Sequence, residues 1–310
     1  MDSGVRAVLA SPAAATWRDY VQVTKPRVVA LIVFTAVVGM LLAVPGWPPL
    51  ARLLTATVGI ALAAAAAAAF NHLLDRRIDA HMLRTRYRPL PQGHLTPAQV
   101  LVLATLLASG SLLVLWGMVN GLVALLTFGS LIGYAVIYTR FLKTITPQNI
   151  VIGGAAGAAP PVLGWVAMTD HVSAVSLSLF MVIFVWTPPH FWALAIGRKE
   201  DYSRAGIPML PVTHGVRFTI LQIALYSVLL FVVSYLPELL GAGGWIFLAG
   251  VSLLNAGFGI RVFRLVRSAS PAPPALGLFR YSISYLTVFF AVLLLCHYLP
   301  YPWGSALRIY

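Results

Sequence analysis

The sequence predicts an all-α integral membrane protein with about nine membrane-spanning helices. Of its 310 residues, 60% are hydrophobic and only 9% are charged, whereas a typical soluble domain has roughly 25% charged residues. A soluble fold of this length has no core large enough to bury so much apolar surface. The apolar residues also gather in runs close to the length that a helix needs to cross a bilayer.

Nine such runs follow one another along the chain, separated by polar connections. We expect spans at Val28–Val44, Leu50–Phe70, Ala98–Val119, Leu122–Phe141, Asn149–Met168, Val172–Ile196, Phe218–Leu239, Trp245–Val266 and Leu278–Leu299. Residues 1–25 lack the features of a signal peptide, so we expect a weakly structured cytoplasmic tail followed by a single transmembrane domain, 26–310. The one cysteine, Cys296, excludes an intrachain disulfide.

The net charge of +13 comes from Lys and Arg residues that lie mostly between the apolar runs. This placement indicates membrane topology and not a nucleic-acid partner. If the N-terminus is inside, nearly all the cationic residues fall in inside segments, and only Arg52 and Arg308 fall on the other side. By the positive-inside rule, we expect the N-terminus inside the cell and the C-terminus outside.

Asn71, Asp75 and Asp79 follow the second run and are spaced four residues apart. Residues at this spacing share one face of a helix, so the spacing predicts one oxygen-rich surface at the membrane edge. Such oxygens favour Mg²⁺, which proteins usually share with substrate phosphates, and the nearby arginines suit a diphosphate. The alternative is a helix end with ordinary caps and surface ion pairs. Because only eight acidic residues occur in the chain, and ionisable groups near membrane depth are usually functional, we favour the metal site.

The following segment contains Arg84-Thr85-x2-Arg88-Pro89-Leu90-Pro91-x-Gly93. Together with Asn-x3-Asp-x3-Asp, this pattern resembles the UbiA superfamily of intramembrane prenyltransferases. The resemblance implies a helical bundle around a central cavity, in which Asn71, Asp75 and Asp79 hold Mg²⁺ on the diphosphate of an isoprenoid donor. It also implies that Arg84 and Arg88 contact that diphosphate.

A second polar segment follows the sixth run and includes Thr187-Pro188-Pro189-His190-Phe191-Trp192. This segment, Ala205–Pro211 and Tyr138-Thr139-Arg140-x2-Lys143 resemble the branch of the superfamily that farnesylates heme B. The resemblance implies farnesyl diphosphate as donor, heme B as acceptor and heme O as product. It further implies the inner membrane of a bacterium, with the active-site loops on the cytoplasmic side, and heme A synthase or terminal oxidase assembly factors as partners.

Many superfamily members carry a second pair of aspartates in the loop after the sixth run, where this chain has Arg198 and Tyr202. Asp201 remains available as a ligand for a second Mg²⁺. We expect the diphosphate to contact the polar side chains of this loop and of the inner end of the fourth span, namely Arg198, Lys199, Tyr202, Arg140 and Lys143.

His190 has two interpretations. The preceding Pro188 and Pro189 can interrupt a membrane helix, and the histidine then either satisfies the freed backbone groups or binds heme iron, for which imidazole is a common axial ligand. His72 is a second candidate for the heme acceptor site, although a lone buried histidine is more often a hydrogen-bonding group.

Several alternatives share parts of these patterns. The small-residue runs Ala63–Ala69 and Gly153–Ala159 predict close helix packing, with a substrate-facing groove as the other interpretation. A prenyltransferase for a quinone precursor or another aromatic ring would need the same Asn71–Asp79 motif. A transporter would contain broken helices and intramembrane charge, but with its ionisable groups near the middle of the membrane. A heme-binding protein without catalysis would need no diphosphate site.

Overall fold

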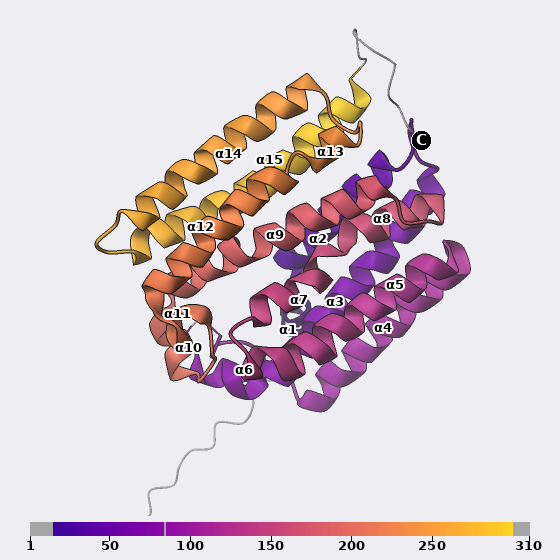
Figure 1. The fold of residues 1–310 in the computed structure, drawn as a ribbon. Helices are drawn as coiled ribbons and strands as arrows, with labels where there is room; N and C mark the ends of the chain where they lie inside the picture. The colour runs from indigo at the N-terminus through magenta and orange to yellow at the C-terminus, as the bar shows by residue number, and fades with distance from the viewer. Residues whose placement is uncertain (1–14, 84, 300–310) are drawn as a thin grey trace, which may run out of the picture.

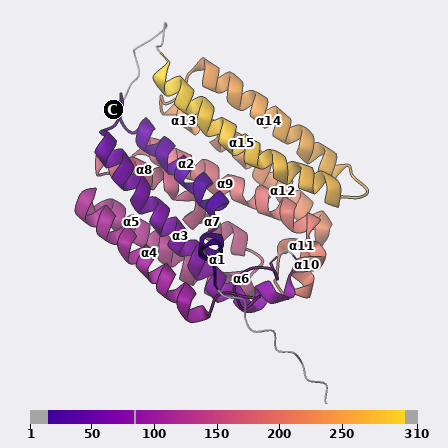
Figure 2. The same ribbon diagram turned by 180° about the vertical axis from the view of Figure 1, so that it is seen from behind.

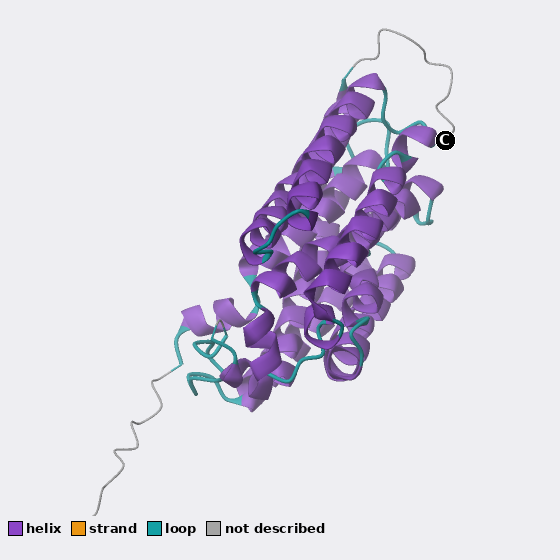
Figure 3. Cartoon of the chain, turned by 60° about the vertical axis from the view of Figure 1, so that its left-hand side comes forward, coloured by secondary structure: helices purple, strands orange, loops and turns teal. Residues whose placement is uncertain are grey.

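The protein is a bundle of long, tilted helices, and no strand occurs among the residues that the structure describes (Figure 3). The computed structural model describes residues 15–83 and 85–299. In chain order the helices are α1 (Trp17–Val23), α2 (Pro26–Leu42), α3 (Leu50–His81), α4 (Pro97–Met118), α5 (Gly121–Ile132), the π-helix η1 (Gly133–Leu142), α6 (Lys143–Ile145), α7 (Asn149–Ala158), α8 (Pro160–Thr169), α9 (Ala174–Gly197), α10 (Lys199–Arg204), α11 (Leu210–Thr213), α12 (Gly215–Val233), α13 (Leu236–Leu239), α14 (Trp245–Val266) and α15 (Ala272–Tyr298).

The lengths of these helices confirm the expected membrane fold. Within the described residues, eight segments are long and apolar enough to cross a bilayer, and there are nine if α1 and α2, which are bent by 50°, count as one span. Large apolar side chains are exposed on the outside of the bundle, including Leu106 at 66% and Leu253 at 75%. Extended apolar surface of this kind suits contact with lipid.

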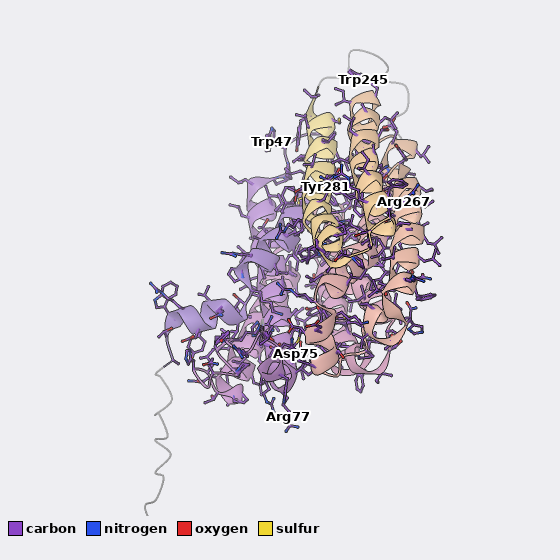
Figure 4. All side chains as sticks on the ribbon, turned by 90° about the vertical axis from the view of Figure 1, so that its left-hand side faces the viewer. Trp47, Asp75, Arg77, Trp245, Arg267 and Tyr281 are labelled. Atoms are coloured by element: carbon purple, nitrogen blue, oxygen red, sulfur yellow. The ribbon has the colours of Figure 1, made fainter. Side chains whose placement is uncertain are left out.

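The helices form two groups that meet along the middle of the molecule (Figures 1 and 2). In the first group α3 packs on α4 and α2 packs on α8, while in the second α9 packs on α12 and α15. Contacts of α9 with α7 and α8 join the groups. Asp75 and Arg77 lie at one end of the bundle, and Trp47 and Trp245 lie at the other (Figure 4).

The segment expected to be a weakly structured tail contains a helix, α1. Its start is fixed by Thr16, whose backbone N–H and hydroxyl both donate to Asp19 Oδ2, at 2.9 and 2.7 Å. These bonds lower the pKa of the Asp19 carboxyl, and Asp19 Oδ1 also lies 3.2 Å from His94 Nδ1. The Thr-x-x-Asp spacing is a variant of the capping box, a sequence signal that could have predicted α1.

Pro188 and Pro189 do not interrupt the sixth span, because α9 runs through both prolines. Each proline removes one backbone donor, yet most of the inner part of α9 is buried against neighbouring helices. Packing therefore keeps the helix continuous. The fifth span, by contrast, is divided into α7 and α8 where Pro160 and Pro161 follow Ala159.

The small residues of α7 allow close helix packing, as expected. A Cβ added at Gly153 would lie 2.0 Å from the Tyr138 ring of η1, and one added at Gly154 would lie 3.0 Å from the Thr187 side chain of α9. At these distances a larger side chain would push the helices apart. Helix α7 therefore connects η1, which reaches the polar end of α3, to the part of α9 that contains His190.

Candidate functional site

The polar face of α3 is the centre of the site. Because α3 continues to His81, Asn71, Asp75 and Asp79 lie on one unbroken helix. All three are buried, with exposed fractions of 5%, 3% and 3%. Asn71 Nδ2 donates to Asp75 Oδ2 at 2.9 Å, which confirms the shared face that the four-residue spacing predicts.

Each of these three residues has its own cationic partner. Lys25 Nζ donates to Asn71 Oδ1 at 2.5 Å, Lys143 Nζ to Asp75 Oδ2 at 2.6 Å, and Arg88 Nη1 to Asp79 Oδ2 at 2.7 Å. Taking paired charges out of water gives little net stability. The cluster is therefore better explained by what it can bind than by what it adds to folding.

Lys25 is a member of the site that the motif analysis missed. It lies in the turn between α1 and α2 with φ 52° and ψ 60°, a left-handed conformation that costs energy for a non-glycine residue and often marks functional sites. Burial and the nearby Arg88 charge lower the pKa of Lys25 to about 7. Lys25 also lines an open hollow of about 600 Å³ between α1 and α2.

The π-helix η1 lines a second side of the site. Thr139 Oγ1 donates to the Tyr134 carbonyl at 2.9 Å and accepts from Asn71 Nδ2 at 3.3 Å. π-helical turns are rare and often occur at functional sites. The turn ends beside Lys143, the partner of Asp75, and no apolar pattern in the sequence predicts it.

The second polar segment lies on α10 and is not part of the same ion-pair cluster. Asp201 is buried and pairs with Arg204 across one turn at 3.3 Å, and Tyr202 is buried beside it. Arg198 and Lys199 are exposed where α10 begins. Residue 84 and the side chain of Arg140 lie outside the described part of the structure, so the expectations for Arg84 and Arg140 stay predictions.

The donor set of α3 suits a magnesium ion that is shared with a substrate. Within the described residues, no group of three or more His, Cys, Asp or Glu side chains is arranged to hold a metal. Mg²⁺ needs no such cage, because it is usually held by one or two carboxylates together with phosphate oxygens. Asp75 and Asp79, with the amide oxygen of Asn71, match that requirement.

The two histidines differ in their surroundings. His190 is 7% exposed, and its Nδ1 lies 2.6 Å from Ser282 Oγ of α15, so this histidine does not satisfy backbone groups freed by the prolines. His72 is 2% exposed, and both of its ring nitrogens are enclosed with no partner among the described residues.

A helical membrane bundle with buried carboxylates and cations at one end suits a membrane-embedded enzyme that acts on a lipid-like substrate with an anionic head. The chain belongs to the UbiA prenyltransferase family, which residues 32–284 match. It is therefore a prenyltransferase, and the resemblance seen in its motifs is confirmed.

Curated relatives extend this assignment along the chain. The protein named protoheme IX farnesyltransferase from Alkalilimnicola ehrlichii is 57% identical over 291 residues, which cover 93% of this chain and 95% of the relative. The protein of the same name from Idiomarina loihiensis is 55% identical over 284 residues, covering 92% and 95%.

Solved structures support the fold. A digeranylgeranylglyceryl phosphate synthase matches with a TM-score of 0.76 at 15% identity, covering 90% of this chain and 98% of that one. A UbiA homolog from Archaeoglobus fulgidus bound to DMAPP and Mg²⁺ matches with a TM-score of 0.62 at 17% identity, covering 89% and 99%. At these identities the likeness establishes the fold alone.

Proposed function

We propose that this prenyltransferase transfers the farnesyl group of farnesyl diphosphate to a vinyl group of heme B and, with addition of water, forms heme O. The observation that carries the proposal is the cluster of Asn71, Asp75 and Asp79, each with a cationic partner, at the membrane edge of α3. The names of the relatives that share more than half of the sequence support the choice of donor and acceptor.

The charges of the cluster suit a diphosphate with one Mg²⁺. With Lys25 protonated, the three cations exceed the carboxylates of Asp75 and Asp79 by one positive charge. A fully ionised diphosphate monoester together with one Mg²⁺ carries one net negative charge, which balances the net charge of these five side chains. Neutrality matters because a buried net charge is costly.

Asn71, Asp75 and Asp79 would hold the Mg²⁺ ion, and Lys25, Arg88 and Lys143 would supply positive charge to the phosphate oxygens. Mg²⁺ supplies charge neutralisation at the leaving diphosphate. The cations act in the same direction, because preorganised positive groups stabilise the charge that develops in the transition state. Arg84, Arg140, Arg198, Lys199 and Tyr202 are further diphosphate contacts in this proposal, and Asp201 is the ligand for any second ion.

The reaction breaks the bond between the allylic carbon of the donor and its diphosphate oxygen, and the diphosphate leaves with the electron pair. The electron-rich vinyl group of heme B attacks that carbon and forms the new carbon–carbon bond. Water adds to the resulting cation and loses a proton, which gives a hydroxyethylfarnesyl group. The allylic carbon becomes cation-like as the diphosphate leaves, and a site that excludes bulk water would protect this carbon from hydrolysis.

The proposal places the protein in a bacterial inner membrane, with the polar end of α3 and helix α10 on the cytoplasmic side. The distribution of Lys and Arg supports this sidedness. Heme O serves terminal oxidases, so heme A synthase and oxidase assembly factors are the protein partners that this function implies.

Product analysis tests the function. Membranes that contain the chain, from a host without its own enzyme, are incubated with heme B, an aromatic acid, Mg²⁺ and isotope-labelled farnesyl diphosphate. Mass spectrometry is expected to find the label in a heme with the added mass of one farnesyl group and one water. Label in the aromatic acid, or in no product, would overturn the proposal.

A further inference from the structure

The imidazole ring of His190 is held between aromatic rings of two helices. Its centroid lies 4.2 Å from that of Trp186 on the same helix, in a stacked arrangement, and 4.6 Å from that of Phe279 on α15. Phe191 contacts it edge-on at 4.9 Å. These contacts fix the plane of the ring, so the direction of each ring nitrogen is set by the packing of α9 against α15.

A hydrogen-bond chain through Ser282 sets the tautomer of this ring. The Ser282 hydroxyl donates its only proton to the Phe279 carbonyl at 2.7 Å. In this arrangement its oxygen accepts from His190 Nδ1, which lies 2.6 Å away, and the ring proton is assigned to Nδ1 on that basis. The Trp186 indole donates to the Ser282 carbonyl at 2.8 Å and holds the two helices in this register.

In a neutral imidazole with a proton on Nδ1, Nε2 carries a lone pair. His190 Nε2 has no hydrogen-bond partner among the described residues, but it is not fully enclosed by protein atoms. Both ring nitrogens of His72 are enclosed in this way. The lone pair of His190 is therefore the accessible one of the two.

We propose that Ser282 is a positioning residue that holds His190 with its Nε2 lone pair directed to the iron of the heme acceptor. The inference rests on the proposed function and adds α15 to the acceptor site. Histidines that bind metals commonly donate their other ring N–H to an oxygen acceptor, which fixes tautomer and orientation. The Ser282–Phe279 chain provides that acceptor inside the bundle.

The test uses the full-length protein in lipid nanodiscs with heme B and no farnesyl diphosphate, so that no turnover is needed. Absorption and resonance Raman spectra report the iron ligand, and titration gives the heme affinity. We expect a histidine-ligated heme in the unmodified protein. The Ser282→Ala variant is expected to weaken or lose this signature and to bind heme about 10–100-fold less tightly.

Matched variants distinguish a change in the position of His190 from a general effect on folding of the protein. Ser282→Thr keeps the hydroxyl and is expected to retain the spectrum. Ser227→Ala removes a buried serine whose hydroxyl, among the described residues, bonds only to the Ile223 carbonyl of the same helix. This variant is expected to change neither spectrum nor affinity. If Ser282→Ala does not fold, Ser282→Cys, a weaker acceptor of similar shape, gives the same comparison. His190→Gly should lose the signature and regain it with added imidazole.

An unchanged spectrum and heme affinity in Ser282→Ala or Ser282→Cys would overturn the role of Ser282. A heme complex of the unmodified protein without a histidine ligand, in a protein that still makes heme O, would overturn the inference and leave the proposed function intact. Absence of any heme binding would contradict both.

Discussion

Replacing Asp75 with asparagine is expected to lower heme O formation on the order of 10³-fold, while the protein still inserts into the membrane. The substitution keeps the side-chain shape but removes the charge that binds Mg²⁺ and pairs with Lys143 Nζ at 2.6 Å. Neutral amides are poorer ligands for this ion when they replace a carboxylate. The measurement is the rate of heme O formation in membranes with saturating Mg²⁺.

Asp170→Asn is the matched control for this variant. Asp170 lies on the α8–α9 connection and pairs with Arg52, with more than half of its side chain exposed. Its substitution is expected to leave turnover unchanged. Normal turnover of Asp75→Asn would instead remove Asp75 from the metal site.

Variants of the Arg88–Asp79 pair are expected to separate the contribution of these residues to stability from their contribution to catalysis. Arg88→Gln leaves the Asp79 carboxylate, which is 4% exposed, buried without its partner and should cost on the order of 3 kcal/mol of stability. Adding Asp79→Asn removes that charge, so the double variant should regain stability but not activity. Thermal unfolding in detergent and heme O formation are measured on the same preparations.

Arg52→Gln, in the exposed pair with Asp170, serves as the stability control and should cost less than about 1 kcal/mol. If the double variant recovered heme O formation together with its stability, Arg88 and Asp79 would be structural and not part of the substrate site.

The α3 half of the site could be predicted because it depends on local geometry. Four-residue spacing places Asn71, Asp75 and Asp79 on one face of any helix, and the structure adds only that this face is buried. The number and order of the membrane spans follow in the same way from the lengths of the apolar runs.

The partners of α3 could not be predicted from spacing, because they depend on contacts between distant segments. Lys25 reaches Asn71 through a left-handed turn 46 residues earlier in the chain. Thr139 needs a π-helix, which has no simple apolar period. The continuity of α9 through Pro188 likewise depends on the helices packed around it, and not on the local preference of proline.

Binding of a prenyl diphosphate together with Mg²⁺ at the α3 cluster is central to the proposed function. The direct measurement is calorimetric binding of farnesyl thiolodiphosphate, an unreactive analogue, to the purified protein with Mg²⁺ or with EDTA. We expect tight binding with Mg²⁺ that is lost in EDTA and in Asp75→Asn but kept in Asp170→Asn. Equal affinity in all four experiments would contradict it.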